Sequence, residues 1–193
     1  MFDASLFYSL RVPEGMSPDI RRMLGGLGDF ALVTVHRQEN TDVPERLEVV
    51  FEALRRLAAD RVVVLPIHPR LRKMLEVGGR FDEMTRGLTV IEPVGFIDML
   101  GLLQATSLVL TDSGGLQKEA YFAGKPVVIL RDETEWVELV AMGCAVLCPP
   151  LSADGILSAA QGMIGRAVPR TGEAPYGTGD AAGRIADILE GAL

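Results

Sequence analysis

The feature that most constrains the fold is an alternation of short apolar runs with segments whose apolar residues recur at helical spacing. Runs rich in β-branched residues predict strands at residues 30–35, 62–65, 88–91, 107–111, 126–130 and 145–147. Helical spacing predicts helices at residues 18–24, 44–58, 70–77, 97–105, 116–122, 135–141, 153–164 and 180–192. Strands that are apolar on both faces and separated by helices are typical of a parallel sheet covered on both sides. The sequence therefore predicts an α/β fold, with a doubly wound, Rossmann-like parallel sheet in a three-layer sandwich.

The domain organisation follows from this pattern. A chain of 193 residues is long enough for one domain with a core of its own, which we expect at residues 16–193. Residues 1–15 belong to no strand–helix unit, so we expect them to be an interdomain connector. Several apolar side chains in that segment have no predicted element to pack on: Phe2, Leu6, Phe7 and Tyr8. Residues 169–179 are rich in Pro, Gly and Thr, which predicts a loop before the last helix.

Composition excludes several classes of function. The net charge of −7 argues against nucleic acid as a partner, because a nucleic-acid surface needs a basic face. No apolar run approaches the roughly 20 residues of a membrane helix, and no signal-peptide pattern opens the sequence, so we expect no membrane partner and a cytoplasmic location. Cys144 and Cys148 lack companions at metal-ligand spacing, so no metal site is expected.

Polar residues follow the ends of the predicted strands, and both histidines of the chain are among them. These segments are residues 36–42, 66–70, 92–96, 112–115 and 131–135. Because the carboxyl ends of parallel strands meet at one edge of the sheet, we expect these segments to form one ligand site.

The segment from Asp112 to Gly115 opens a predicted helix with the sequence DSGG. Two glycines let a ligand approach the backbone closely, and the first N–H groups of a helix attract an anion. Glu119, on the same helix, could accept hydrogen bonds from both hydroxyls of a ribose. These features favour a diphosphate site; the alternative is Ser113 as an ordinary helix cap followed by a tight turn.

The histidines and arginines allow two interpretations each. His36 could donate a proton or hydrogen bond to a phosphate, or could cap its own loop through Asn40 or Asp42. His68 is interpreted as a buried structural residue, with a ligand role as the alternative. For Arg37 the alternative to a ligand role is ion pairing with acidic neighbours, and for Arg131 ion pairing is the preferred interpretation.

Other chemistries lack their motifs. The G-x-S-x-G turn of a serine hydrolase does not occur. Neither the G-x-G-x-x-G motif of dinucleotide-binding proteins nor a phosphate-binding loop with Gly-Lys-Ser/Thr is present, which disfavours NAD and ATP. We expect no cofactor.

Five strings in order along the chain resemble the UDP-N-acetylglucosamine 2-epimerases of the non-hydrolysing type. They are VTVHRQENTD (residues 33–42), IHPR (67–70), LTDSGGLQKEA (110–120), GKPV (124–127) and RDETE (131–135). Such enzymes have the GT-B architecture, in which two Rossmann-like domains face each other across a cleft. The resemblance covers the second, C-terminal domain with the connector before it, which makes the N-terminal domain an expected partner and a homodimer the expected assembly.

The resemblance also implies roles for individual residues. His36 would be catalytic and lie beside the sugar diphosphate. The UDP would be bound by Arg37, Val94, Met99, Ser113, Gly114, Gly115 and Glu119. Within this set Ser113 and the two glycines would hold the diphosphate, Glu119 the ribose, and Val94 and Met99 the uracil through their backbones.

The implied reaction converts UDP-N-acetylglucosamine to UDP-N-acetylmannosamine by elimination of UDP and its re-addition. The carboxylates that move the C2 proton would lie in the other domain, so this chain alone is expected to be inactive. The alternatives are a hydrolysing 2-epimerase, a GT-B glycosyltransferase domain, and a stand-alone nucleotide-sugar-binding module. One position departs from the family: many members have arginine and proline after the glutamate matching Glu135, where this chain has Trp136 and Val137. A cationic contact to the diphosphate is therefore missing at that position.

Overall fold

The computed structural model describes residues 1–168 and 175–191 and contains one six-stranded parallel sheet. The strands are β1 (Phe30–Thr34), β2 (Val62–Pro66), β3 (Thr89–Ile91), β4 (Leu108–Thr111), β5 (Val127–Ile129) and β6 (Ala145–Leu147). Their order across the sheet is β3-β2-β1-β4-β5-β6. The predicted doubly wound α/β fold is confirmed, because every neighbouring pair of strands is parallel and the order reverses at β1.

Strand β1 is the centre of the sheet and the point where its two halves meet. It pairs with β2 on one side and β4 on the other, so that Leu32 lies opposite both Val64 and Val109. Between the carboxyl ends of β1 and β4 the crossovers run in opposite directions, which opens a crevice in folds of this type. The pairing also places Thr34 opposite Thr111 at that edge.

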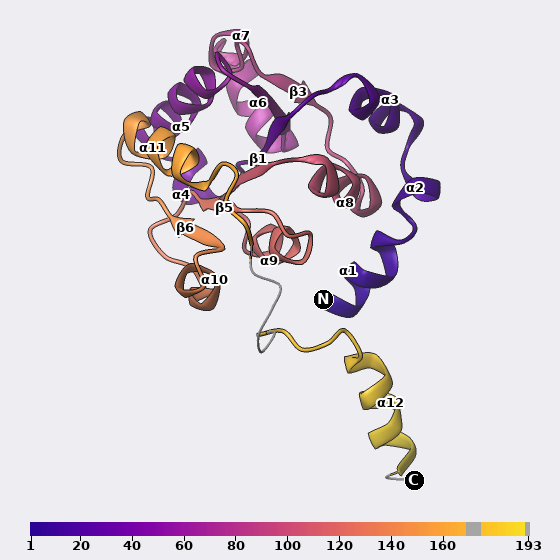
Figure 1. Cartoon of the computed structure of the whole chain (residues 1–193). Helices are drawn as coiled ribbons and strands as arrows, with labels where there is room; N and C mark the ends of the chain where they lie inside the picture. The colour runs from indigo at the N-terminus through magenta and orange to yellow at the C-terminus, as the bar shows by residue number, and fades with distance from the viewer. Residues whose placement is uncertain (169–174, 192–193) are drawn as a thin grey trace.

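Helices cover both faces of the sheet (Figure 1). One face is covered by α5 (Pro44–Leu57), α6 (Pro69–Val77), α7 (Phe81–Met84) and α11 (Ala153–Met163), and the other by α2 (Val12–Gly15), α3 (Pro18–Gly26), α8 (Phe96–Ala105), α9 (Gly114–Phe122) and α10 (Val137–Ala141). Along β1, Ala31 and Val33 point to the first layer while Phe30 and Leu32 point to the second, and all four are fully buried or nearly so. This two-sided burial is the reason that the strand is continuously apolar.

Some boundaries differ from those predicted, for local reasons. Helix α9 begins at Gly114 rather than residue 116, because the Ser113 side chain caps it by accepting the N–H of Leu116. Helix α10 begins only after Trp136, whose backbone N–H is bound by the Thr134 hydroxyl. Besides α2 and the first helix of the N-terminal segment, two short helices were not predicted: α7 and α4 (Gln38–Thr41).

The N-terminal segment packs on the domain more than its sequence suggested. It forms α1 (Phe2–Ser9) and α2, and Val12 is buried. The expectation that its aromatic residues lack partners was wrong, since Phe2 stacks on Phe122 with ring centroids 4.6 Å apart and Tyr8 meets the edge of Phe96 at 5.6 Å. A role for residues 1–15 as a connector stays a prediction.

The last helix, α12 (Ala181–Gly191), stands apart from the body of the domain (Figure 1). None of its residues is buried, and its first turn is held through the Ala182 N–H, which donates to the Asp3 carboxylate of α1 at 2.8 Å. Residues 169–174 of the predicted loop and residues 192–193 lie outside the described part. Within residues 1–168 and 175–191, no helix is long and apolar enough to span a bilayer.

Candidate functional site

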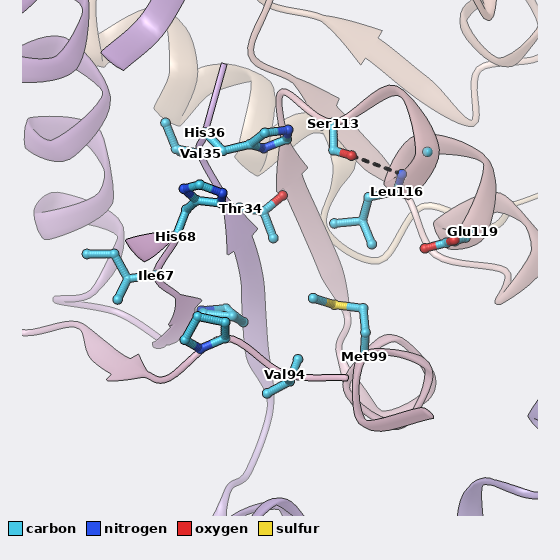
Figure 2. A pocket seen from close by; sticks show the side chains of 13 residues that line it. Thr34, Val35, His36, Ile67, His68, Val94, Met99, Ser113, Leu116 and Glu119 are labelled. Carbon is cyan, nitrogen blue, oxygen red and sulfur yellow. Dashed lines mark hydrogen bonds between the residues drawn. The ribbon is translucent and has the colours of Figure 1, made fainter. Parts of the chain in front are cut away.

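A cavity of about 330 Å³ opens at the carboxyl edge of the sheet, where β1 and β4 meet (Figure 2). Residues at the ends of β1, β2, β3 and β4 all contribute to it, as the strand-end pattern predicted, whereas none of residues 131–135 after β5 lines it. The lining residues are Thr34, Val35, His36, Pro66, Ile67, His68, Pro93, Val94, Met99, Ser113, Gly115, Leu116 and Glu119. In Figure 2 His36 and Ser113 lie toward one side of the cavity, and Val94 and Met99 toward the other.

The first turn of α9 forms one wall. Ser113 is held by three hydrogen bonds: its N–H donates to the Thr111 hydroxyl at 2.9 Å, its Oγ accepts the N–H of Leu116 at 3.4 Å, and its carbonyl accepts the N–H of Gln117 at 3.2 Å. A Cβ atom added at Gly115 would meet nothing closer than the Ser113 hydroxyl, at 3.9 Å, so the backbone there is open to a ligand. The unpaired N–H groups at a helix start carry partial positive charge. This wall can therefore bind an anion through its backbone.

Asp112, which directly precedes Ser113, organises the part of the wall that carries His36, although its sequence position gave no hint of a partner. The carboxylate is fully buried and accepts the backbone N–H groups of His36 and Arg37 and the Asn40 amide, at 2.9–3.2 Å. It also lies 3.0 Å from Nδ1 of His36. Burial by itself would raise the pKa of Asp112, but the hydrogen bonds from His36 and the backbone hold it below its usual range.

The Asp112 carboxylate therefore fixes the orientation of the His36 ring. The alternative in which His36 caps its own loop through Asp42 or Asn40 was wrong, because Asn40 donates to Asp112 and to the Leu130 carbonyl, and Asp42 binds Arg70. With Nδ1 facing Asp112, the proton belongs on Nδ1, and Nε2 is left for a ligand.

His68 lies at the second strand end and is exposed, so the expectation of a buried residue was wrong. Its Nδ1 accepts the N–H of Arg70 at 3.2 Å and so caps α6, which gives it a structural role. It also lines the cavity, with its ring stacked 6.1 Å from that of His36. Its place shortly after a strand was the sequence signal for this second role, as a residue that lines the cavity.

Glu119 lies one and a half turns along α9 and is partly buried. It lines the cavity and also a smaller one of about 240 Å³ that reaches α1 and α8. Burial raises the pKa of this carboxyl group. A ligand that donates hydrogen bonds to it would replace water lost on burial.

The two arginines after β1 and β5 converge on Glu135. Arg131 is buried and donates to Glu39 at 3.0 Å and to Glu135 at 2.8 Å, so the predicted ion pairing is confirmed. Arg37 lies 3.9 Å from Glu135, and about a third of its side chain is exposed. Neither Arg37 nor Gly114 lines the cavity itself, whereas His36, Val94, Met99, Ser113, Gly115 and Glu119 do.

Three lining residues lie outside the segments and residues that the sequence predicted to face a ligand: Thr34, Val35 and Leu116. Thr34 could not have been singled out, because its exposure depends on the neighbouring strand, where its hydroxyl meets that of Thr111 at 2.6 Å. Among residues 1–168 and 175–191, no three His, Cys, Asp or Glu side chains are grouped as a metal site would require.

Comparison with known proteins gives a consistent assignment. The family described as UDP-N-acetylglucosamine 2-epimerase matches residues 1–190. A UDP-2,3-diacetamido-2,3-dideoxy-D-glucuronate 2-epimerase from Pseudomonas aeruginosa is 44% identical over 190 residues, which is 98% of this chain and 50% of that protein. A UDP-N-acetylglucosamine 2-epimerase from Methanocaldococcus jannaschii is 35% identical over 165 residues, or 83% of this chain and 44% of that protein.

Solved structures agree. The crystal structure of the Methanocaldococcus jannaschii UDP-GlcNAc 2-epimerase in complex with UDP-GlcNAc and UDP superposes with a TM-score of 0.84 at 32% identity, covering 98% of this chain and 52% of that one. The chain thus spans about half the length of the relatives it matches. With the match of residues 1–190, the chain belongs to the UDP-N-acetylglucosamine 2-epimerase family.

Proposed function

We propose that this chain is the UDP-binding half of a UDP-sugar 2-epimerase and that the cavity between β1 and β4 receives the UDP group. The observation that carries the proposal is the meeting of the open α9 turn, Glu119 and the Asp112-oriented His36 around one cavity. The relative that was crystallised with UDP-GlcNAc and UDP has the same fold over 98% of this chain.

Each part of UDP matches one part of the lining. The diphosphate would sit against the N–H groups at the start of α9, with Ser113 and Gly115 nearest, and Arg37 and Gly114 just behind. The ribose hydroxyls would donate to Glu119, which is partly buried on the same helix. The uracil would lie toward Val94 and Met99, where the cavity wall is apolar.

The proposed chemistry is reversible elimination of UDP. The C1–O bond to the β-phosphate breaks as a base removes the C2 proton, which leaves a 2-acetamidoglucal and UDP. Re-addition of UDP, with a proton delivered to C2 on the other face, gives the epimer. His36 would act at the leaving diphosphate, with Nε2 free to donate to or accept from a phosphate oxygen.

The residues that move the C2 proton would belong to an N-terminal domain. General acid–base catalysis contributes about 10²- to 10⁴-fold, so this half alone should bind UDP and not turn over substrate. We further propose a cytoplasmic homodimer for the complete enzyme, which would supply activated sugars for cell-surface polysaccharides.

A second candidate substrate comes from the Pseudomonas aeruginosa relative, whose name specifies a diacetamido glucuronate in place of N-acetylglucosamine. Identity of 44% over nearly the whole chain favours this candidate. Both sugars carry the same UDP, so the cavity described above serves either. Hydrolysing epimerase, glycosyltransferase and stand-alone binding activities are the competing functions.

Calorimetric titration of the 193-residue chain with UDP tests the proposal. Saturable heat is expected with the wild type, and Glu119→Ala should weaken binding because the ribose loses its acceptor. Glu45→Ala, which alters an exposed carboxylate in the first turn of α5, is the matched control and should bind as the wild type does. Absence of heat from the wild type at millimolar UDP would overturn the proposal.

A further inference from the structure

Trp136, the only tryptophan of the sequence, touches the proposed diphosphate wall from behind. Its indole Nε1–H donates to the carbonyl oxygen of Gly114 at 2.8 Å. Gly114 is the first residue of α9, and its carbonyl carbon is joined to the nitrogen of Gly115. The indole therefore holds one end of the peptide unit whose other end is the Gly115 N–H.

Residues 134–136 contact α9 at two further points. The Lys118 ammonium lies 3.7 Å from the centre of the Trp136 ring, in a cation–π contact. The Thr134 hydroxyl donates to the side-chain oxygen of buried Gln117 at 2.7 Å and accepts the backbone N–H of Trp136 at 3.1 Å. The residues contacted are thus Gly114, Gln117 and Lys118, which lie among the first five residues of α9.

An aromatic neighbour holds the indole in place. The ring of Tyr176 meets Trp136 nearly edge-on, with centroids 6.2 Å apart. The Tyr176 hydroxyl in turn donates to Glu138 of α10 at 2.6 Å. Trp136 is partly buried, and it is fixed by its own backbone, by Lys118 and by Tyr176.

The contact with Gly114 has a consequence for anion binding. The C=O and N–H of one peptide unit point in opposite directions, so a donor at the Gly114 oxygen directs the Gly115 N–H away from itself, toward the cavity that Gly115 lines. Polarisation along such a chain of hydrogen bonds also strengthens the N–H as a donor. Two adjacent glycines have no side chains to fix this peptide plane, so an external hydrogen bond matters more here than in an ordinary helix.

We propose that Trp136 is a positioning residue that fixes the Gly114–Gly115 peptide unit for the diphosphate. This inference rests on the proposed UDP binding and deepens it, because it assigns the orientation of that wall to a residue outside the cavity. The Trp136 side chain carries no charge, so its effect on binding comes from the orientation and polarisation of this peptide unit.

Trp136→Phe tests the inference, since it keeps an aromatic ring for Lys118 and removes the N–H together with the five-membered ring that carries it. UDP binding should weaken by about 3- to 10-fold, the usual effect of one hydrogen bond, while uridine binding should not change. Tyr8→Phe is the matched control: it also removes a polar group from an aromatic side chain, but on α1 and away from the contacts of Trp136, and UDP binding should be as in the wild type. Equal UDP affinity in Trp136→Phe and wild type would overturn the role of Trp136.

A measurement on the wild type avoids any dependence on the folding of a variant. The single indole gives one N–H signal in a ¹H–¹⁵N spectrum. That signal should move when UDP or inorganic pyrophosphate is added and stay in place with uridine. An unmoved signal under saturating UDP would contradict the inference alone, whereas failure of the wild type to bind UDP would overturn the proposed function as well.

Discussion

The Asp112 carboxylate lies 3.0 Å from Nδ1 of His36 and at the same time accepts the backbone N–H of that residue. The two residues are 76 positions apart in the sequence and are joined because β1 and β4 are neighbours in the sheet. Asp112 thus fixes both the backbone at the end of β1 and the histidine ring. A carboxylate surrounded only by donors is suited to being permanently ionised.

Asp112→Asn should destabilise the fold and misorient His36. An amide keeps the shape but turns an NH₂ group toward groups that all donate, so buried donors lose their acceptor. A loss of about 2 kcal/mol or more in the free energy of unfolding is expected. Urea denaturation measures it, and ring signals of His36 at fixed pH report its altered tautomer. Asp60→Asn, in the exposed turn after α5, is the control. Unchanged stability of Asp112→Asn would show that the network contributes little.

The same carboxylate predicts a pH dependence of stability. The folded-state pKa of Asp112 lies below its usual value of 3.8, so as pH falls the unfolded chain binds the proton first. The stabilisation is therefore complete above the unfolded pKa and is lost as the pH falls through the folded pKa. Thermal unfolding in a series of acidic buffers should show a steeper decline for the wild type than for Asp112→Asn. Parallel declines would contradict this assignment.

Glu119 should affect the pH dependence of stability in the opposite direction to Asp112. Burial raises its folded-state pKa above the usual 4.5, so the folded protein holds the proton more tightly than the unfolded chain. Its contribution is favourable below the unfolded pKa and is lost as pH rises through the folded pKa, which leaves an ionised, desolvated group at neutral pH. Glu119→Gln should thus unfold at a higher temperature than the wild type at pH 7, and bind UDP more weakly.

The control for this prediction is Glu45→Gln, whose carboxylate is exposed on α5. It should alter neither the unfolding temperature nor UDP binding. A Glu119→Gln protein that is less stable at neutral pH would mean that its carboxylate is stabilised by contacts rather than strained by burial.

The sheet and the location of the site were predictable from sequence, because both follow from local patterns. Phe30, Leu32 and their neighbours are apolar on both faces of a strand, and the carboxyl ends of parallel strands share one edge whatever the details of packing. The partners of individual side chains were not predictable. Asp112 meets His36, and Trp136 meets Gly114, only through the order of strands and the path of the segment after β5.

The burial of a side chain was also not predictable where it depends on the geometry at the end of a helix or strand. His68 precedes Pro69 directly after a buried strand, and the sequence does not say whether the chain has yet reached the surface. Phe2 contacts Phe122 because α1 packs against α9, and these two helices are far apart in the sequence.

Gly115→Ala should separate UDP binding from stability. The added Cβ has no atom closer than the Ser113 hydroxyl at 3.9 Å, and Gly115 has no positive φ, so the fold accepts it. Alanine also restricts the unfolded chain, which should stabilise the protein by about 0.4–1 kcal/mol. The methyl group would nevertheless stand on the cavity wall, where the diphosphate must approach the backbone, and UDP affinity should fall by about tenfold or more, equivalent to 1.4 kcal/mol.

Gly162→Ala makes the same change on the exposed face of α11, with open space around it, and should give the stabilisation without the loss of binding. Thermal unfolding and calorimetry on both variants decide the matter: if Gly115→Ala binds UDP as well as Gly162→Ala does, the diphosphate does not rest on this turn.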